Sequence, residues 1–175
     1  MGHAVETEFS PLRIAVLTVS DSRTRENDTS GDALQERLET AGHQLADRLI
    51  VPDNIYLMRE IFSRWIASPD VQVVISTGGT GLTGRDSTPE AVTPLFDKSI
   101  EGFGELFRQV SLKDIGGSTI QSRAVAGLAN STLIFCLPGS TGACKTGWDE
   151  ILKDQLDIRT RPCNVAQMYP RMGEE

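Results

Sequence analysis

Apolar strands alternate with helical patterns between residues 12 and 76, and this alternation constrains the fold more than any other feature of the sequence. Leu12–Val19 is nearly all apolar, as expected for a strand that is covered on both faces. The same rhythm predicts a helix that is capped by Thr29 or Ser30 and stops at Gly42, followed by a strand over Gln44–Val51. It then predicts a helix whose apolar face runs from Ile55 to Ile66 and a strand over Val71–Ser76. The short connections predict a three-layer α/β fold, in which a mostly parallel sheet lies between helices.

The second half of the chain is less regular. Thr88-Pro89 fits a helix start, with threonine as the cap and proline at the first helical position. The remaining predicted elements are a short helix over Glu105–Ser111, two strands over Ala124–Ala129 and Thr132–Leu137, and a last long helix marked by Trp148, Ile151, Leu152 and Leu156. The two strands meet at Asn130-Ser131, as in a hairpin, so one edge of the sheet is expected to be antiparallel. Residues 1–175 are interpreted as a single domain with a polar tail over residues 1–11.

Length, charge and composition exclude several function classes. A chain of 175 residues with 39% hydrophobic residues suits one globular domain with a sizeable core. The net charge of −7 argues against broad nucleic-acid binding, which requires clustered cations. No apolar run approaches the roughly 20 residues of a membrane span, and the first residues contain no apolar leader. We therefore expect a cytoplasmic protein with no membrane or nucleic-acid partner.

The cysteines agree with a reducing compartment. Cys136, Cys144 and Cys163 match no zinc-binding spacing, and their odd number argues against a disulfide framework. Cys136 lies inside the apolar run Leu133–Leu137, which predicts a buried and unreactive thiol.

A glycine-rich loop follows the predicted strand Val71–Ser76 and is the strongest candidate for a binding site. Four glycines, at positions 78, 79, 81 and 84, allow positive φ angles and a close approach of the backbone to a ligand. Hydroxyl side chains surround these glycines, and Asp86 is the loop's only carboxylate. Bare amides and hydroxyls at the carboxyl end of a strand are suited to an anionic ligand.

The same loop also satisfies G-x-G-x-x-G through Gly79, Gly81 and Gly84, which suggests a nicotinamide-dependent enzyme. A dinucleotide fingerprint should open its helix within the motif, but here the next helix start is Thr88, beyond the last glycine. No Gly-Lys-Ser/Thr follows either, so the loop is not a P-loop. The nicotinamide interpretation remains a distant alternative.

A second loop, Leu137–Gly142, follows another predicted strand, and in a parallel sheet two such loops converge at one edge. The simpler interpretation is that its glycines only make a tight turn. Asp86 could hold a metal, or it could cap a helix or pair with Arg85. Asp53 follows a strand and could be a metal ligand or an ordinary turn residue, and Asp21 and Asp28 are equally ambiguous. Bare carboxylates repel phosphate, so a divalent cation would have to bridge them. Local positive charge could come from Arg23, Arg25, Arg85, Arg123 and Arg159.

Three ordered motifs resemble a known family. STGGTGLTGRDSTPEAV, EGFGELFRQVSL and QSRAVAGLANSTLIFCLPGS resemble the molybdenum cofactor biosynthesis family of MoaB, MogA and the gephyrin G domain. The resemblance extends from about Leu12 to Leu156, and PGSTGACKTGW and DIRTRPCN are most similar to the MoaB branch. It implies a mixed α/β fold, a homotrimer or a homohexamer built as a dimer of trimers, and a pocket for molybdopterin. In active members it also implies Mg-ATP-dependent transfer of AMP to the molybdopterin phosphate.

The resemblance assigns roles to individual residues of this chain. It implies a ligand-binding segment of Thr77, Gly78, Gly79, Thr80 and Gly81, metal-binding and catalytic acids at Asp86 and Asp53, and a pterin side of Ser122, Pro138, Gly139 and Ser140. Where the MogA-like pattern often places another proline after Pro138-Gly139, this chain has Ser140-Thr141. That departure bears on catalysis more than on binding. Two functions therefore stay open, a molybdopterin adenylyltransferase and a non-catalytic molybdopterin-binding carrier.

Overall fold

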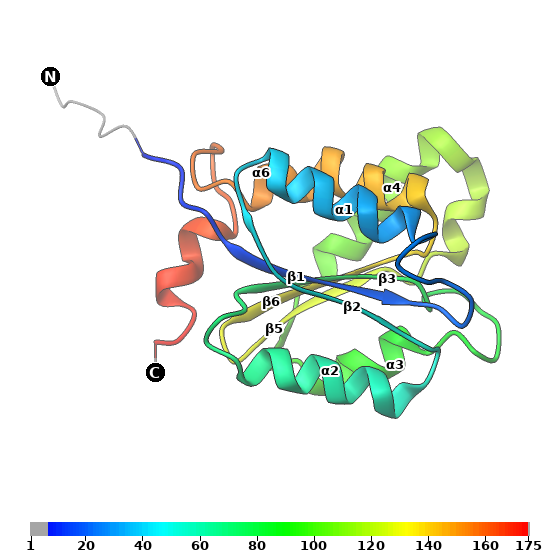
Figure 1. Cartoon of the computed structure of the whole chain (residues 1–175). Helices are drawn as coiled ribbons and strands as arrows, with labels where there is room; N and C mark the ends of the chain where they lie inside the picture. The colour runs from blue at the N-terminus through cyan, green and yellow to red at the C-terminus, as the bar shows by residue number, and fades with distance from the viewer. Residues whose placement is uncertain (1–6, 175) are drawn as a thin grey trace, which may run out of the picture.

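One six-stranded sheet forms the centre of the molecule, in the strand order β2-β1-β3-β6-β5-β4 (Figure 1). The computed structural model describes residues 7–174. The strands are β1 (Arg13–Val19), β2 (Gln44–Val51), β3 (Val73–Thr77), β4 (Lys98–Ser99), β5 (Val125–Ala129) and β6 (Thr132–Leu137). β2, β1, β3 and β6 run parallel, whereas β5 and the short β4 complete the sheet as antiparallel strands. The predicted α/β fold and its antiparallel edge are confirmed.

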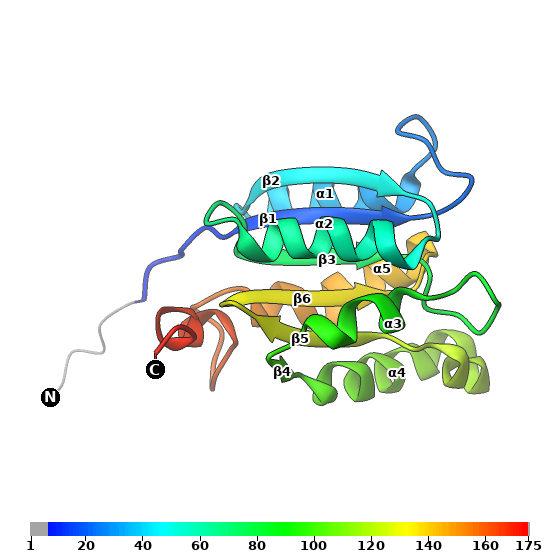
Figure 2. The same cartoon turned by 90° about the horizontal axis from the view of Figure 1, so that it is seen from below.

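Helices cover both faces of this sheet (Figures 1 and 2). The α-helices are α1 (Thr29–Thr40), α2 (Ile55–Ala67), α3 (Thr88–Val92), α4 (Glu101–Ile115), α5 (Thr141–Gly147) and α6 (Lys153–Gln155). A π-helical segment, Trp148–Leu152, joins α5 to α6, so the predicted last helix is interrupted near its middle. Short 3₁₀ turns cover Thr93–Leu95, Gly116–Gln121 and Ala166–Arg171. Helices α2 and α3 lie on one face, and α1, α4, α5 and α6 lie on the other.

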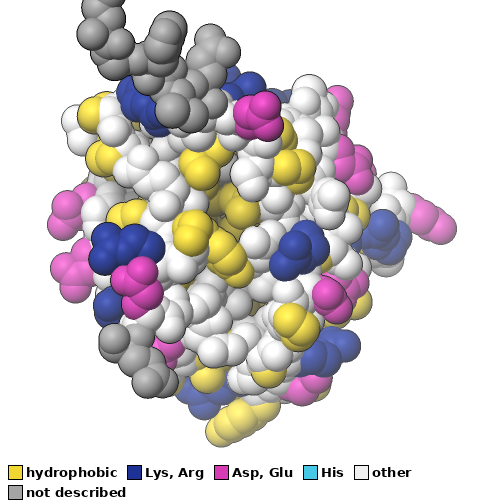
Figure 3. Space-filling model, turned by 90° about the vertical axis from the view of Figure 1, so that its left-hand side faces the viewer, with side chains coloured by type: hydrophobic (Ala, Val, Ile, Leu, Met, Phe, Trp, Pro, Cys, Tyr) yellow, Lys and Arg dark blue, Asp and Glu magenta, His cyan; other side chains and the backbone are white. Residues whose placement is uncertain are grey.

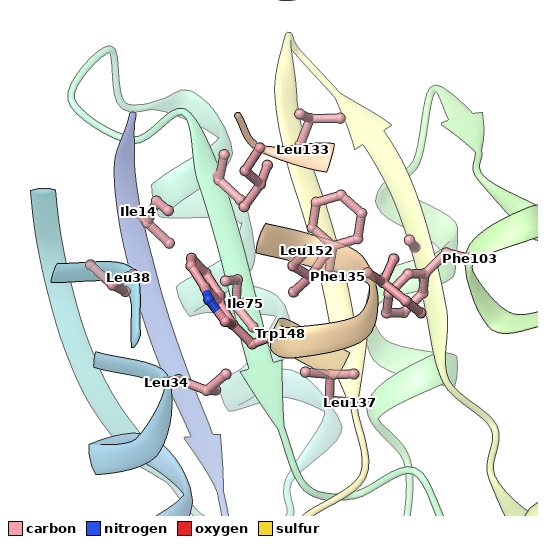
Figure 4. Packing of buried hydrophobic residues seen from close by; sticks show 14 of the residues in the cluster. Ile14, Leu34, Leu38, Ile75, Phe103, Leu133, Phe135, Leu137, Trp148 and Leu152 are labelled. Atoms are coloured by element: carbon pink, nitrogen blue, oxygen red, sulfur yellow. The ribbon is translucent and has the colours of Figure 1, made fainter. Parts of the chain in front are cut away.

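The core consists of two apolar layers, one on each side of the sheet. Alternate residues of β1, such as Ile14 and Ala15, belong to opposite layers because strand side chains alternate in direction. Figure 4 shows the larger layer, in which Trp148 and Phe103 extend from their helices toward the sheet. The rings of Phe103 and Phe135 meet edge to face at 5.2 Å between centroids. Burial of side chains on both faces of β1, β3 and β6 thus explains why these strands are mostly apolar in sequence, unlike the edge strand β2.

The starts of three helices differ from the predictions. α4 begins at Glu101 and ends at Ile115, well beyond the predicted Glu105–Ser111. Gly104 weakens the helical pattern there, but a Cβ at that position would lie 2.5 Å from the Ala124 carbonyl oxygen. The glycine therefore allows α4 to pack closely against the chain that leads into β5.

The other two differences concern helix caps. Asp28 caps α1 by accepting a hydrogen bond from the Gly31 N–H at 2.9 Å, so neither Thr29 nor Ser30 is the cap. Thr88 is the first residue of α3 and not its cap, and its buried hydroxyl donates to the Gly78 carbonyl at 2.8 Å. In both cases the hydroxyls that suggested a cap are used to attach the helix start to a neighbouring loop.

The thiols differ sharply in accessibility. Cys136 and Cys144 are buried, whereas Cys163 is exposed. Burial raises the pKa of Cys136 to about 12 and that of Cys144 to about 11, so neither forms the reactive thiolate near neutral pH.

We expect a thiol reagent added to the native protein to modify Cys163 rapidly, because its thiol is exposed and accessible to the reagent. Cys136 and Cys144 should react only after denaturant is added. Mass spectrometry of labelled peptides distinguishes the three positions. Rapid native labelling of Cys136 would contradict its placement inside β6.

The two ends of the sheet differ in character. Figure 3 shows the end of the molecule at which β1 begins, where apolar side chains gather at the centre and charged side chains of both signs surround them. The parallel strands point toward the opposite end, where long loops extend past the arrowheads (Figure 2). Within residues 7–174 no helix is long and apolar enough to cross a bilayer.

Candidate functional site

A pocket of about 810 Å³ opens at the carboxyl ends of the parallel strands. Its walls come from the loops after β1, β2, β3 and β6, from the starts of α1 and α5, and from the end of α4 with the following 3₁₀ turn. The predicted site residues that line it are Asp53, Thr77, Gly78, Gly79, Thr80, Gly81, Asp86, Ser122, Pro138, Gly139 and Ser140. The chain therefore brings every predicted site residue to one pocket, and their roles toward a ligand stay predictions.

The glycine loop after β3 depends on its first two glycines. Gly78 has a φ of 101° and Gly79 a φ of 67°, a region that side chains with a Cβ rarely adopt. A Cβ on Gly78 would also lie 2.1 Å from the Val19 carbonyl oxygen at the end of β1. The loop therefore passes directly over the end of the neighbouring strand, and its backbone lines the pocket.

Hydrogen bonds join this loop to the second loop, after β6. The Gly78 N–H donates to the Leu137 carbonyl at 3.0 Å, and the Thr77 hydroxyl donates to the Pro138 carbonyl at 2.8 Å. A Cβ on Gly139 would lie 3.2 Å from the Gly78 Cα, so the two backbones touch. The second loop is thus part of the pocket as well as a tight turn.

The start of α1 supports the second loop from the other side. The Ser30 hydroxyl donates to the Gly139 carbonyl at 2.8 Å, and the hydroxyls of Thr29 and Thr141 lie 2.7 Å apart. Ser140 caps α5 by accepting from the Ala143 N–H at 3.1 Å. These contacts connect three separate elements around one wall of the pocket.

Asp86 is held within its own loop. Its Oδ2 accepts from the Thr83 hydroxyl at 2.6 Å and from the Thr83 N–H at 2.9 Å. The Thr83 hydroxyl is the main reason that the pKa of Asp86 lies below its ordinary value, so the carboxylate is ionised. Asp86 neither pairs with Arg85 nor caps α3. Arg85 pairs with Asp21 at 2.6 Å, and α3 has no side-chain cap.

Asp53 faces the glycine loop from the turn after β2. Its Oδ1 lies 3.2 Å from the position that a Cβ on Gly79 would occupy. Burial, followed by the charges of Asp21 and Asp86, raises the pKa of Asp53 above its ordinary value. The adjacent Asn54 caps α2, so Asp53 is not required as a helix cap. Asp53 is therefore a carboxylate placed in an unfavourable negative field.

A divalent cation fits these two carboxylates only together with ligand oxygens. Among residues 7–174, no three His, Cys, Asp or Glu side chains gather closely enough to hold a metal ion by themselves. Mg²⁺ commonly binds through one or two carboxylates together with phosphate oxygens and water. A cation held by these carboxylates would also oppose the repulsion that, after burial, raises the pKa of Asp53. The donor set is thus suited to a metal that arrives with a phosphorylated ligand.

Sequence reasoning missed much of the remaining wall. Phe107 and Ile115 of α4 give the pocket an apolar side opposite the polar loops. Ile115 was missed because it lies beyond the predicted helix Glu105–Ser111, and Phe107 was missed because an apolar residue inside a helix gives no local signal of a pocket wall. Ser122 lies near this wall, and its buried hydroxyl has no hydrogen-bond partner within the described part of the chain. An apolar wall beside bare amides and a free hydroxyl suits a ligand with both a ring system and an anionic group.

The charge of the pocket is mostly negative. Arg23 is the one lysine or arginine side chain among the described lining residues, whereas four aspartates contribute to the wall: Asp28, Asp53, Asp86 and Asp114. Arg48 neutralises Asp28 through a buried contact of 2.9 Å. An anionic ligand would therefore depend on backbone amides and an added cation more than on side-chain cations.

Comparison with known proteins agrees with the motifs. Residues 15–158 match a family described as "Probable molybdopterin binding domain". The chain is 60% identical over 160 residues to molybdenum cofactor biosynthesis protein B of Escherichia coli K12, covering 91% of this chain and 94% of the relative. It is 46% identical over 149 residues to the protein of the same name from Staphylococcus carnosus, covering 83% and 87%.

Solved structures give the same result. A crystal structure of molybdenum cofactor biosynthesis protein B superposes with a TM-score of 0.82 at 42% identity, covering 84% of this chain and 92% of the other. A tungsten cofactor synthesizing protein MoaB from Pyrococcus furiosus superposes with a TM-score of 0.74 at 37% identity, covering 82% and 92%. The chain therefore belongs to the molybdenum cofactor biosynthesis protein family, on the side of its MoaB branch.

Proposed function

We propose that the pocket binds molybdopterin and that the chain acts in molybdenum cofactor biosynthesis by transferring AMP from Mg-ATP to the molybdopterin phosphate. One observation carries this proposal. Two joined glycine loops, two carboxylates and an apolar wall surround a single pocket in a chain of this family. The bare amides suit phosphate groups, and the apolar wall suits a fused ring system.

Different groups of the chain would bind the phosphates, the metal and the second substrate. Backbone amides of the Thr77–Gly81 segment, other than the Gly78 N–H that bonds Leu137, would hold phosphate oxygens. The free Ser122 hydroxyl would bond the second substrate. Asp53 and Asp86 would hold Mg²⁺, which supplies charge neutralisation for the phosphates when bound. A molybdopterin phosphate oxygen then attacks the α-phosphorus of ATP, and the bond to the β-phosphate oxygen breaks to release pyrophosphate. Such a reaction needs mainly positioning and charge stabilisation from the protein.

A molybdopterin carrier without turnover is the second candidate function. It is favoured by the state of Asp86, whose Oδ2 already accepts two hydrogen bonds from Thr83. These two hydrogen bonds give Asp86 a structural role in its own loop, and that role does not require a metal.

One assay distinguishes the two functions. The purified chain is incubated with molybdopterin, Mg²⁺ and ATP, and adenylylated molybdopterin and pyrophosphate are measured. Mg-dependent formation of both products supports the adenylyltransferase. Binding of molybdopterin without product supports the carrier, and binding of neither substrate contradicts both proposals.

We also propose that the chain assembles as a homotrimer or homohexamer. Four large apolar side chains are exposed along α4 and the following 3₁₀ turn: Leu106, Leu112, Ile115 and Ile120. Closed symmetry is the usual arrangement of soluble homo-oligomers, and such a surface suits an interface. Light scattering at micromolar concentration should give the mass of three or six chains. A monomer or simple dimer would be incompatible with this assembly.

A further inference from the structure

One guanidinium group contacts both ends of the glycine loop. Arg123 lies between the 3₁₀ turn Gly116–Gln121 and β5, and its side chain is 29% exposed. Its Nε–H donates to the Gly81 carbonyl at 2.9 Å and to the Thr80 carbonyl at 3.3 Å. An Nη2–H donates to the Asp86 carbonyl at 3.2 Å. The two ends of the segment Thr80–Asp86 are therefore bridged by a residue about forty positions away in sequence.

The rest of that segment has weak support. Thr83 and Asp86 bond to each other within the segment, and a Cβ on Gly84 would meet no atom within 4 Å. The contact from Arg85 to Asp21 joins two side chains that are 65% and 44% exposed. Exposed ion pairs of this kind contribute little to stability. Arg123 is thus the partly buried attachment that holds this segment against the body of the protein.

We infer that Arg123 is a positioning residue, which presets the Thr80–Asp86 segment so that the glycine amides and Asp86 face the ligand together. The part of this inference that concerns ligand affinity rests on the proposed function. The part that concerns loop order does not, because the contacts exist within the chain alone.

The chemistry of arginine explains why this residue type is needed. Its planar fork carries five N–H donors in fixed directions, so one side chain can serve three carbonyls and the Glu90 carboxylate together. A lysine ammonium is a compact charge that cannot span both ends of the segment. The bonds to carbonyl oxygens do not depend on Glu90, which pairs with a different nitrogen.

The test compares three variants with the unaltered chain. Arg123→Gln removes the bridge, Arg123→Lys keeps the charge but not the fork, and Glu90→Gln removes only the ion pair. Hydrogen exchange followed by mass spectrometry reports on peptides that cover residues 80–88, without any ligand. Isothermal titration then gives the affinity for molybdopterin and for Mg-ATP, and thermal unfolding records global stability.

We expect exchange in residues 80–88 to become several-fold faster or more in Arg123→Gln and in Arg123→Lys, while Glu90→Gln stays close to the unaltered chain. Affinity should fall roughly tenfold or more in the two Arg123 variants, because a disordered loop must be ordered on binding. Exchange that is unchanged in Arg123→Gln would overturn the inference. Full restoration by lysine, or an equal effect of Glu90→Gln, would also overturn it.

Failure of the proposed function has a different signature. If the unaltered chain binds neither molybdopterin nor Mg-ATP, the proposed function is wrong. The exchange result still decides whether Arg123 orders the segment.

Discussion

The Asp86→Asn variant is expected to lose most Mg-dependent nucleotide binding and adenylyl transfer while it stays folded. The amide oxygen of asparagine can still accept from the Thr83 N–H and hydroxyl, which now bond the carboxylate at 2.9 and 2.6 Å. The loop is therefore retained, and the change in unfolding free energy should stay below about 1 kcal/mol. What disappears is the negative charge that would hold Mg²⁺. That contribution is roughly several kcal/mol, which corresponds to about a hundredfold or more in rate.

Isothermal titration with Mg-ATP, the adenylylation assay and thermal unfolding measure these effects together. Asp154→Asn is the matched control, because it removes one carboxylate charge from an exposed position on α6. Unchanged metal-dependent binding and turnover in Asp86→Asn would reject a metal-binding role for this residue. A large loss of stability would instead assign Asp86 to the loop's folding.

Asp28→Ala is expected to be the most destabilising single substitution in the site region. Asp28 is fully buried and accepts from the Thr18 hydroxyl at 2.7 Å, from Arg48 at 2.9 Å and from the Gly31 N–H at 2.9 Å. Removing it leaves the Arg48 guanidinium, only 4% exposed, without its buried partner. Breaking a buried pair in this way costs about 3–5 kcal/mol, or roughly 10 °C in melting temperature for a chain of this size.

Asp32→Ala is the matched control for this prediction. Asp32 contacts the same guanidinium at 2.7 Å, but its side chain is 58% exposed. Its loss should therefore cost less than about 1 kcal/mol. Chemical denaturation of both variants gives the two free energies. Equal costs would contradict the view that burial makes the Asp28 contact important.

The contact between Asp28 and Arg48 should also make the free energy of unfolding depend on pH in acid. Burial alone would raise the pKa of Asp28, but hydrogen bonds from Arg48, Gly31 and Thr18 outweigh it and hold the pKa below the ordinary value of 3.8. A lowered pKa means that the stabilisation is complete above pH 3.8 and is lost as the pH falls toward the folded-state pKa. In Asp28→Ala this part of the acid dependence should be absent.

The buried pair also connects stability to the site. Asp28 caps α1, and the first turn of that helix bonds the second loop through the Ser30 hydroxyl and the Gly139 carbonyl. A Cβ on Gly31 would lie 2.1 Å from the Asp28 Oδ2, so this glycine makes room for the pair. The position of the second loop thus depends on a charge contact that is outside the loop itself.

The strands, most helices and the two glycine loops could be predicted from local patterns in the sequence. Apolar runs identify strands that are covered on both faces, and Ile55–Ile66 shows the 3.6-residue period of α2. Each of these signals depends on residues close together in the chain. The candidate pocket could also be predicted, because the carboxyl ends of parallel strands meet at one edge of the sheet.

The partners of the charged residues could not be predicted in this way. A pair between Arg85 and Asp86 was one of the alternatives that the sequence left open, but Arg85 pairs with Asp21. Arg123 bonds carbonyls about forty residues away. Arg48 was not considered as a site residue, yet it neutralises an aspartate in the pocket wall. Such contacts depend on how loops from distant strands pack over the sheet. Side-chain charge is visible in the sequence, but the distance and burial that give it an energetic effect arise only when the elements are assembled.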